Sequence, residues 1–251
     1  FAKTHRNLLS KSGSSTALKF FLKLILSCAI FCTSLSVPVR AESSEVLNIK
    51  DSLIGDARQV VVVENTKKES TSATLSIYAK GEQGWRKQMA SIAVRIGRSG
   101  FSAQRREGDG TTPMGSFRIQ SVFGIVPVPS TGYPYIRLKE NYCWVLRSSQ
   151  KTYNSLVKGS PCVKGDENLF RIAKAGPYRR SIVLDFNMNP VILGHGGAIF
   201  IHSHSYDGAG NTKPTSGCVS LTNGQLVKLL KLLDASLQTR VIMGTKSFLA
   251  A

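Results

Sequence analysis

The stretch Ile199-Phe200-Ile201-His202-Ser203-His204 has the composition of a buried β-strand that ends on polar residues, and a loop containing Gly, Asn and Lys follows it. The chain then continues as Pro214-Thr215-Ser216-Gly217-Cys218-Val219-Ser220-Leu221, in which a cysteine follows a Ser-Gly turn. Short apolar runs bounded by turn-forming residues are typical of strands. This unit therefore predicts a mainly β fold and supplies a histidine and a cysteine from neighbouring segments.

Outward from this unit, further short runs rich in Val, Ile, Thr and Tyr alternate with turn sequences. Such runs predict buried or half-buried strands. In addition to 198–202, strands are expected at residues 59–63, 73–78, 89–96, 116–122, 135–138 and 181–186. Residues 97–115 and 139–180 lack this pattern and are interpreted as loops. The sequence therefore predicts one mainly β domain over residues 56–246, preceded by a polar lead-in at 42–55.

One amphipathic helix is expected after the cysteine. Its apolar positions follow a 3.6-residue period and form one face, which predicts core packing. Thr222 and Gln225 have the spacing of a capping box at its start. The leucines of the apolar face are Leu226, Leu229, Leu230 and Leu233.

The first 41 residues have the pattern of a secretory signal. A basic stretch reaches Lys19, an apolar run follows from Phe20 to Val37, and Val39-Arg40-Ala41 offers small residues at the positions that a signal peptidase requires. The run is short for a membrane span and contains a lysine. We therefore predict a signal peptide at 1–41 and export to the periplasm or cell envelope. Retention as a membrane anchor is the alternative.

The five cysteines divide between the two parts of the chain. Cys28 and Cys32 fall in the predicted signal, which leaves Cys143, Cys162 and Cys218. If Cys143 pairs with Cys162, the closed loop stabilises the fold by about 3 kcal/mol on a chain-entropy estimate. That pairing, which we predict, leaves Cys218 as an unpaired thiol in an oxidising compartment, and such a thiol is a candidate reactive group.

The surroundings of Cys218 fit nucleophilic catalysis. A catalytic thiol needs a base, and His202 is the nearest candidate. Gly217 lets the backbone approach a substrate, so the N–H groups of Gly217 and Cys218 could form an oxyanion hole. The start of the following helix would lower the thiol pKa if it lies close. The alternative is a buried structural cysteine beside a structural histidine.

These residues resemble the catalytic signature of L,D-transpeptidases, the YkuD-like domain, over roughly residues 58–245. His202 precedes Cys218 of a (Ser/Thr)-x-Gly-Cys turn by sixteen residues. Residues 107–117, Glu-Gly-Asp-Gly-Thr-Thr-Pro-Met-Gly-Ser-Phe, are similar to a second element of that domain. A third is the strand at 182–187, followed by the Gly-rich 194–197. The sequence looks closest to a branch with a Pro-Thr-Ala/Ser-Gly-Cys-Val form.

The resemblance implies a β-sandwich-like fold and an acyl-enzyme mechanism on peptidoglycan stem peptides, without a metal or other cofactor. It implies Cys218 as nucleophile, His202 as base, Ser203 as the residue that orients the imidazole, and Gly217 with Cys218 as the oxyanion hole. We assign substrate binding to Thr215, Ser216 and His204. The acceptor, an amine for transpeptidation or water for L,D-carboxypeptidation, stays open, because both meet the same acyl-enzyme.

Two positions depart from the family pattern. Ser216 stands where the family often has His, and Ser220 stands where Arg is common. These differences favour a second possibility, a wall-binding module with impaired catalysis. A zinc site is a third possibility, since a strand would place His202 and His204 on one face. His195 and Cys218 could be further ligands, but no carboxylate or second cysteine with ligand spacing completes the site.

The charge of the chain favours anionic surroundings. There are 33 Lys and Arg against 15 Asp and Glu, and residues 1–41 contain six of the basic residues and no acid, which leaves 27 against 15. Anionic cell-wall polymers fit this excess. No nucleic-acid motif occurs, so nucleic acid is not expected as a partner, and membrane contact is expected only through an uncleaved signal. Further candidates for the substrate cleft, each also readable as surface or core, are Arg95, Arg98, Arg105, Arg106, Tyr133, Tyr135, Arg137, Lys139 and Trp144.

Overall fold

The structure is a computed structural model that describes residues 47–159 and 161–251. The predicted signal at 1–41, including Cys28 and Cys32, and the first part of the lead-in lie outside the described residues. Among the residues that are described, no helix has the length and apolar character to cross a membrane.

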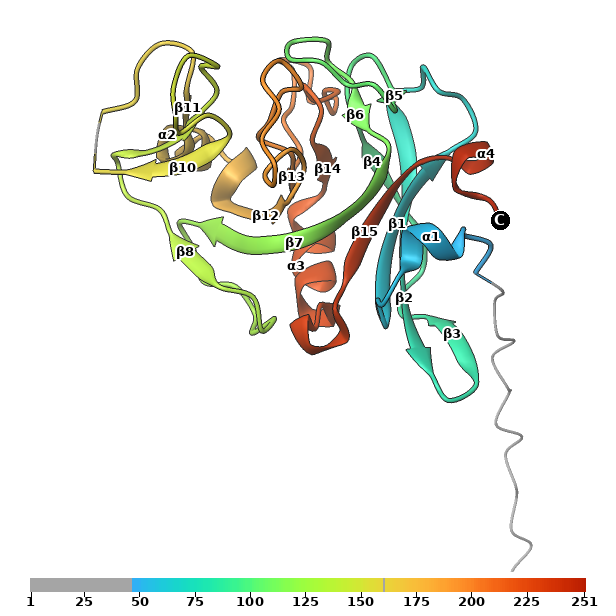
Figure 1. The fold of residues 1–251 in the computed structure, drawn as a ribbon. Helices are drawn as coiled ribbons and strands as arrows, with labels where there is room; N and C mark the ends of the chain where they lie inside the picture. Colours follow the sequence, from blue (N-terminus) through green and yellow to red (C-terminus); the bar gives the residue numbers. More distant parts are fainter. Residues whose placement is uncertain (1–46, 160) are drawn as a thin grey trace, which may run out of the picture. The chain divides into compact units, whose positions relative to one another are not determined.

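Most strands belong to one sheet that closes on itself (Figure 1). The order in the ring is β1, β15, β7, β12, β13, β14, β4 and β2, and β2 pairs again with β1. This closure removes the open edges that β1 and β2 would otherwise present. Two short strands extend the ring, β3 (Gly84–Lys87) from β2 and β8 (Tyr135–Arg137) from β7. The ring strands are β1 (Gln59–Asn65), β2 (Ser72–Gly81), β4 (Ile92–Arg95), β7 (Gly115–Gly124), β12 (Arg180–Leu184), β13 (Phe200–Ser203), β14 (Val219–Leu221) and β15 (Arg240–Thr245).

The period-2 alternation of the strands separates two faces. On β13, Ile201 packs into the main aliphatic core, whereas Phe200 belongs to a second, largely aromatic cluster. The same division applies to β1, where Val61 faces the main core and Val60 faces a smaller cluster. The prediction of a mainly β domain is confirmed.

The predicted helix is α3 (Asn223–Leu232), and it begins with the expected capping box between Thr222 and Gln225. Its leucine face is buried in the main core. A strand that the sequence did not predict, β14, lies between Cys218 and this helix. Three strand residues span about 10 Å. The condition under which the helix start would lower the thiol pKa, closeness to Cys218, is therefore not met, because the charge of a helix end acts only over its first turn.

The segment at 139–180 is not the loop that we predicted. It forms a small antiparallel sheet of β9 (Tyr142–Val145), β10 (Ser155–Lys158) and β11 (Glu167–Asn168), followed by α2 (Leu169–Lys174) and the 3-10 turn η1 (Pro177–Arg179). We call residues 139–180 the insert. Its strands are only two to four residues long. Local alternation is too brief in such strands to be recognised, and tertiary contacts stabilise them instead.

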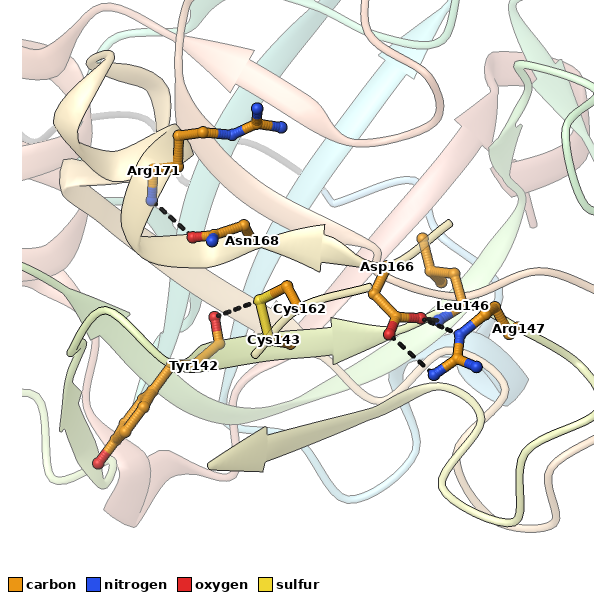
Figure 2. The surroundings of a disulfide bond; sticks show 8 residues. All are labelled: Tyr142, Cys143, Leu146, Arg147, Cys162, Asp166, Asn168 and Arg171. Carbon is orange, nitrogen blue, oxygen red and sulfur yellow. Dashed lines mark hydrogen bonds and ion pairs between the residues drawn. A yellow bond between two sulfur atoms is a disulfide. The ribbon is translucent and has the colours of Figure 1, made fainter. Parts of the chain in front are cut away.

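Figure 2 shows three of these contacts. Cys143 and Cys162 form the predicted disulfide. Arg147 donates from Nε and Nη2 to the two carboxylate oxygens of Asp166, at 3.1 and 3.2 Å. The side chain of Asn168 caps α2 by accepting from the Arg171 N–H at 2.9 Å. The insert is thus held by a bridge, a bidentate ion pair and a helix cap within about thirty residues of chain.

The remaining elements are short. The predicted loop at 97–115 contains a two-stranded parallel pair, β5 (Phe101–Ser102) and β6 (Thr112–Pro113). The end of the polar lead-in forms α1 (Asp51–Ile54), which packs with α4 (Lys246–Leu249) against the outer face of β1. The 3-10 turn η2 (Ala235–Leu237) connects α3 to β15, a strand that the sequence analysis did not identify.

Candidate active site

A cavity of about 620 Å³ lies between the ring and the insert. Both Cys218 and His202 line it, together with Thr215, Ser216 and Gly217 of the cysteine turn. The insert contributes a further wall, and so does the loop that precedes β6. The lining residues from these two segments are Arg98, Arg105, Glu107, Gly108, Leu146, Gly165, Glu167, Ile172, Pro177 and Tyr178.

Cys218 is the free thiol of the described residues and is 7% exposed. Its Sγ–H donates to the Ala198 carbonyl at 3.2 Å, and its sulfur accepts from the Phe200 N–H at 3.3 Å. Burial raises the pKa of this thiol to about 12, and the Glu167 carboxylate adds to the rise. The thiol is therefore protonated at neutral pH in the unliganded cavity.

His202 is buried, and its tautomer follows from its hydrogen bond. The ring Nδ1 lies 2.7 Å from the Ser203 carbonyl oxygen. A carbonyl only accepts, so Nδ1 carries the proton of the neutral ring and Nε2 keeps a lone pair. Burial lowers the pKa of His202 to about 4. Ser203 thus orients the ring through its backbone oxygen, while its hydroxyl is buried without a partner among the described residues.

The sulfur and the imidazole share one cavity without a hydrogen bond between them in the described part of the chain. β13 and β14 pair in parallel, with His202 beside Ser220. Cys218 therefore lies just before β14, two residues from the position beside His202. The thiol donates to Ala198 instead. The site is a neutral thiol next to a neutral base.

The cysteine turn is fixed by threonine hydroxyls. Thr215 Oγ1 accepts from the Gly217 N–H at 3.0 Å and donates to the Cys218 carbonyl at 2.6 Å. Thr112 Oγ1 donates to the Gly217 carbonyl at 2.8 Å. The Gly217 N–H is consequently occupied, in contrast to the expected two-donor oxyanion hole. The backbone N–H of Cys218 makes no hydrogen bond to the residues that the structure describes, so it is the donor that faces no competition.

The segment at 107–117 helps to hold the cysteine turn in place. Asp109 accepts from the Thr111 N–H and the Thr111 hydroxyl, both at 2.8 Å, and from the Arg106 N–H at 2.7 Å. These bonds fold the loop so that Thr112 reaches the cysteine turn. Gly217 has φ of +145°, and a Cβ there would come within 2.5 Å of Arg105. Glycine is therefore required at 217 both by its backbone angle and by the close approach of Arg105.

Two insert residues in the cavity were missed by the sequence analysis. Tyr178 is buried, and its hydroxyl donates to Glu167 Oε2 at 2.9 Å. The Tyr178 ring meets the His202 ring edge-on, with centroids 5.1 Å apart. Burial raises the pKa of Glu167 to about 7. No sequence spacing links these residues to Cys218, because the insert reaches the cavity only through its tertiary packing on the ring.

Other predicted residues are spread over the molecule. The His204 Nδ1 lies 2.9 Å from the Ser220 hydroxyl, and His204 is not among the cavity-lining residues. His195 is on an exposed loop. No group of three or more His, Cys, Asp or Glu side chains that could hold a metal ion occurs in residues 47–159 and 161–251. Trp144 packs in the aromatic cluster rather than in this cavity.

A family model described as YkuD, L,D-transpeptidase catalytic domain, matches residues 58–245. A search of curated proteins found no match. A solved structure, the helical cell shape determining protein Pgp2 from Campylobacter jejuni, is similar with 18% identity and a TM-score of 0.42. The similarity covers 78% of this chain and 51% of that protein, so the chain spans about half the length of the structure it matches.

Proposed function

The chain belongs to the L,D-transpeptidase catalytic domain family, and from this premise we propose that it is an exported cysteine acyltransferase acting on peptidoglycan stem peptides. One observation carries the proposal. Within the matched residues, a single cavity is lined by an unpaired cysteine and by a histidine whose Nε2 is left free to accept a proton. These are the two groups that thiol-dependent acyl transfer requires.

The chemistry follows from the two neutral groups. The Cys218 sulfur attacks the carbonyl carbon of an L-centre in the stem while its proton passes to His202 Nε2. The C–N bond to the terminal D-residue then breaks, and His202 returns the proton to the leaving amine. A thioester remains on Cys218. The amine of a second stem attacks this thioester, loses a proton to His202 and restores the thiol.

The geometry of the cavity without substrate indicates which side chain must move when substrate binds. The Sγ–H points to the Ala198 carbonyl, so a rotation about the Cys218 side chain is needed before His202 can accept the proton. The Cys218 N–H supplies one oxyanion donor, and the Tyr178 hydroxyl is close enough to Cys218 to lower the pKa of its thiol.

Water in place of the second amine would make the protein an L,D-carboxypeptidase. A third outcome is binding without turnover, as a wall-binding module. Cys218 is a free thiol in a cavity, and hydrogen bonds hold the turn that carries it. These features support catalysis over binding alone, because a binding module has no need of such a thiol.

The test is intact-mass analysis of the purified protein incubated with tetrapeptide-bearing muropeptides. We expect loss of the terminal D-residue, a covalent adduct on Cys218 and a cross-linked product. Acylation by a carbapenem should give the same adduct site. Cys218→Ala should keep the fold and abolish every one of these products. Ser155→Ala, which alters an insert hydroxyl outside the cavity lining, is the matched control.

The outcomes separate the three possibilities. Release of the D-residue without a cross-linked product would indicate the carboxypeptidase. Unchanged binding of muropeptides with no adduct in the wild type would leave the wall-binding module. Product formation by Cys218→Ala would end the proposal. Export is tested by N-terminal sequencing of the protein from an envelope fraction, where cleavage after Ala41 is expected.

A further inference from the structure

Arg105 is a buried cation beside the nucleophile. Its side chain is 7% exposed and lines the same cavity as Cys218. The guanidinium fits between two glycines: a Cβ at Gly217 would lie 2.5 Å from Nη1, and a Cβ at Gly196 would lie 3.4 Å from Nε and Nη2. Its positive charge lowers the pKa of Cys218, against the stronger effect of burial. Arg105 is thus electrostatically coupled to the thiol.

The hydrogen bonds of Arg105 are confined to one nitrogen. Nη1 donates to the Thr111 carbonyl and lies 3.4 Å from both the Ser216 carbonyl and Asp109 Oδ1. Nε is buried with no partner, and the described residues offer none to Nη2. Three of the five guanidinium N–H groups are therefore unused. Of these groups Nε is buried, and a buried donor without a partner is costly, so in native structures a bound water or ion, local strain or a functional role accounts for it.

The charge of Arg105 is only partly neutralised by its neighbours. Asp109 forms an ion pair with Nη1 at 3.4 Å, and its oxygens also accept from Arg106 and Thr111. Glu107, the other acid near the loop, accepts from the Tyr153 hydroxyl at 3.1 Å. Arg98 and Lys213 line the cavity as well. The cavity lining thus holds three cationic residues, Arg98, Arg105 and Lys213, against two acidic ones, Glu107 and Glu167, and Glu167 acts more strongly on the Cys218 thiol than Arg105 does.

We propose that the Nε–Nη2 edge of Arg105 is a carboxylate-binding subsite, which takes the C-terminal carboxylate of the peptide that Cys218 attacks. The proposal rests on the function proposed above. The two parallel N–H groups of that edge match the two oxygens of a carboxylate. In a peptide that loses its last residue, this carboxylate is one residue from the attacked carbonyl. Arg105 would thereby restrict attack to the bond before a terminal residue.

The first experiment compares two reagents of nearly equal size, iodoacetate and iodoacetamide, for alkylation of Cys218. For each protein, the ratio of the iodoacetate rate to the iodoacetamide rate is divided by the same ratio for a free thiol in solution. In the wild type the ratio should shift toward iodoacetate by about 10-fold or more, the effect expected of one charged hydrogen-bonded contact. Arg105→Met should remove the shift, and Arg105→Lys, which keeps the charge and loses the planar edge, should keep part of it.

Arg137→Met is the control, because it removes one exposed positive charge from β8, outside the cavity. It should leave the ratio unchanged. An unshifted ratio in the wild type, or the same shift in Arg105→Met, would overturn the proposal. Folding of each variant is checked by its melting temperature. If Arg105→Met does not fold, the decision passes to the second experiment, which needs no change at Arg105.

The second experiment measures binding of a tetrapeptide and of its C-terminal amide to the Cys218→Ala variant by calorimetry. The acid should bind about 10-fold or more tightly than the amide. Equal affinities would overturn the subsite while leaving the acyltransferase proposal intact, provided that the wild type processes the peptide. If neither peptide binds but the reagent ratio depends on Arg105, the subsite holds and the proposed peptide substrate is wrong.

Discussion

The ring and the insert meet at β13, and they are stabilised in different ways. The ring has an aliphatic core that is continuous across eight paired strands and α3. The insert has three short strands, a disulfide and an ion pair, and it contributes aromatic and acidic residues to the cavity. The ring supplies the thiol and the imidazole, whereas the insert supplies Tyr178 and Glu167. This difference indicates that mutations can change the reactive groups and the cavity wall separately.

The largest effect is expected for His202, the general base that the ring supplies. His202→Gln should lower the rate of acyl-enzyme formation by about 100- to 10,000-fold, since the general base is lost. Its effect on stability depends on pH. Because the folded-state pKa is about 4, below the usual value, the wild type loses stability as pH falls from 6.5 to 4. Gln does not titrate, so the variant should lose less. Stopped-flow acylation and urea unfolding at pH 5 and 7.5 measure both effects, and an unchanged rate would remove His202 from the mechanism.

A core variant of the ring should change stability without changing chemistry. Leu229→Ala in α3 removes a fully buried side chain and should lower the free energy of unfolding by about 2–5 kcal/mol. The acylation rate per folded molecule should stay the same. Urea unfolding measures the first and active-site titration the second. The neighbouring exposed Lys228→Ala is the control, expected within about 0.5 kcal/mol of the wild type.

The insert should respond to loss of its bridge. Removing Cys143 and Cys162 together as serines should cost about 3 kcal/mol on the chain-entropy estimate. Acylation should persist in the protein that remains folded, because neither residue lines the cavity. Differential scanning calorimetry measures the change, and hydrogen exchange should locate the loosening at 139–180. Loosening centred on the ring instead would contradict the division into two regions.

The smallest effect is expected for Glu167. Its folded-state pKa of about 7 lies above the usual value, so the wild type loses stability as pH rises from 4.5 to 7. Glu167→Gln removes this titration and should gain up to about 3 kcal/mol relative to the wild type between pH 4.5 and 8. Urea unfolding at the two pH values is the measurement. Glu140→Gln, at an exposed residue of the insert, is the control. A constant difference at both pH values would mean that folding does not raise the pKa of Glu167.

The sequence predictions were accurate where the pattern extends over several neighbouring residues. β1 was recognised because it contains four consecutive valines, and α3 because its leucines repeat over two turns. β14 has three residues and β11 has two, which are too short for a periodic signal. The predicted site residues on the 198–221 unit could be named because they stand in one contiguous pattern. Arg105 could be named only as one charge among several, since nothing local distinguishes it from a solvated surface residue.

The sequence by itself determined the mainly β class, the helix after Cys218, the free thiol, and the histidine and cysteine of the candidate site. These depend on side-chain periodicity and spacing over a few residues. Tertiary structure alone decided that the sheet closes through β1 and β2, that the insert walls the cavity, and that Thr112, Arg105 and Tyr178 meet the cysteine turn. Such contacts join residues tens of positions apart, and their energies depend on burial and on packing that no local pattern records.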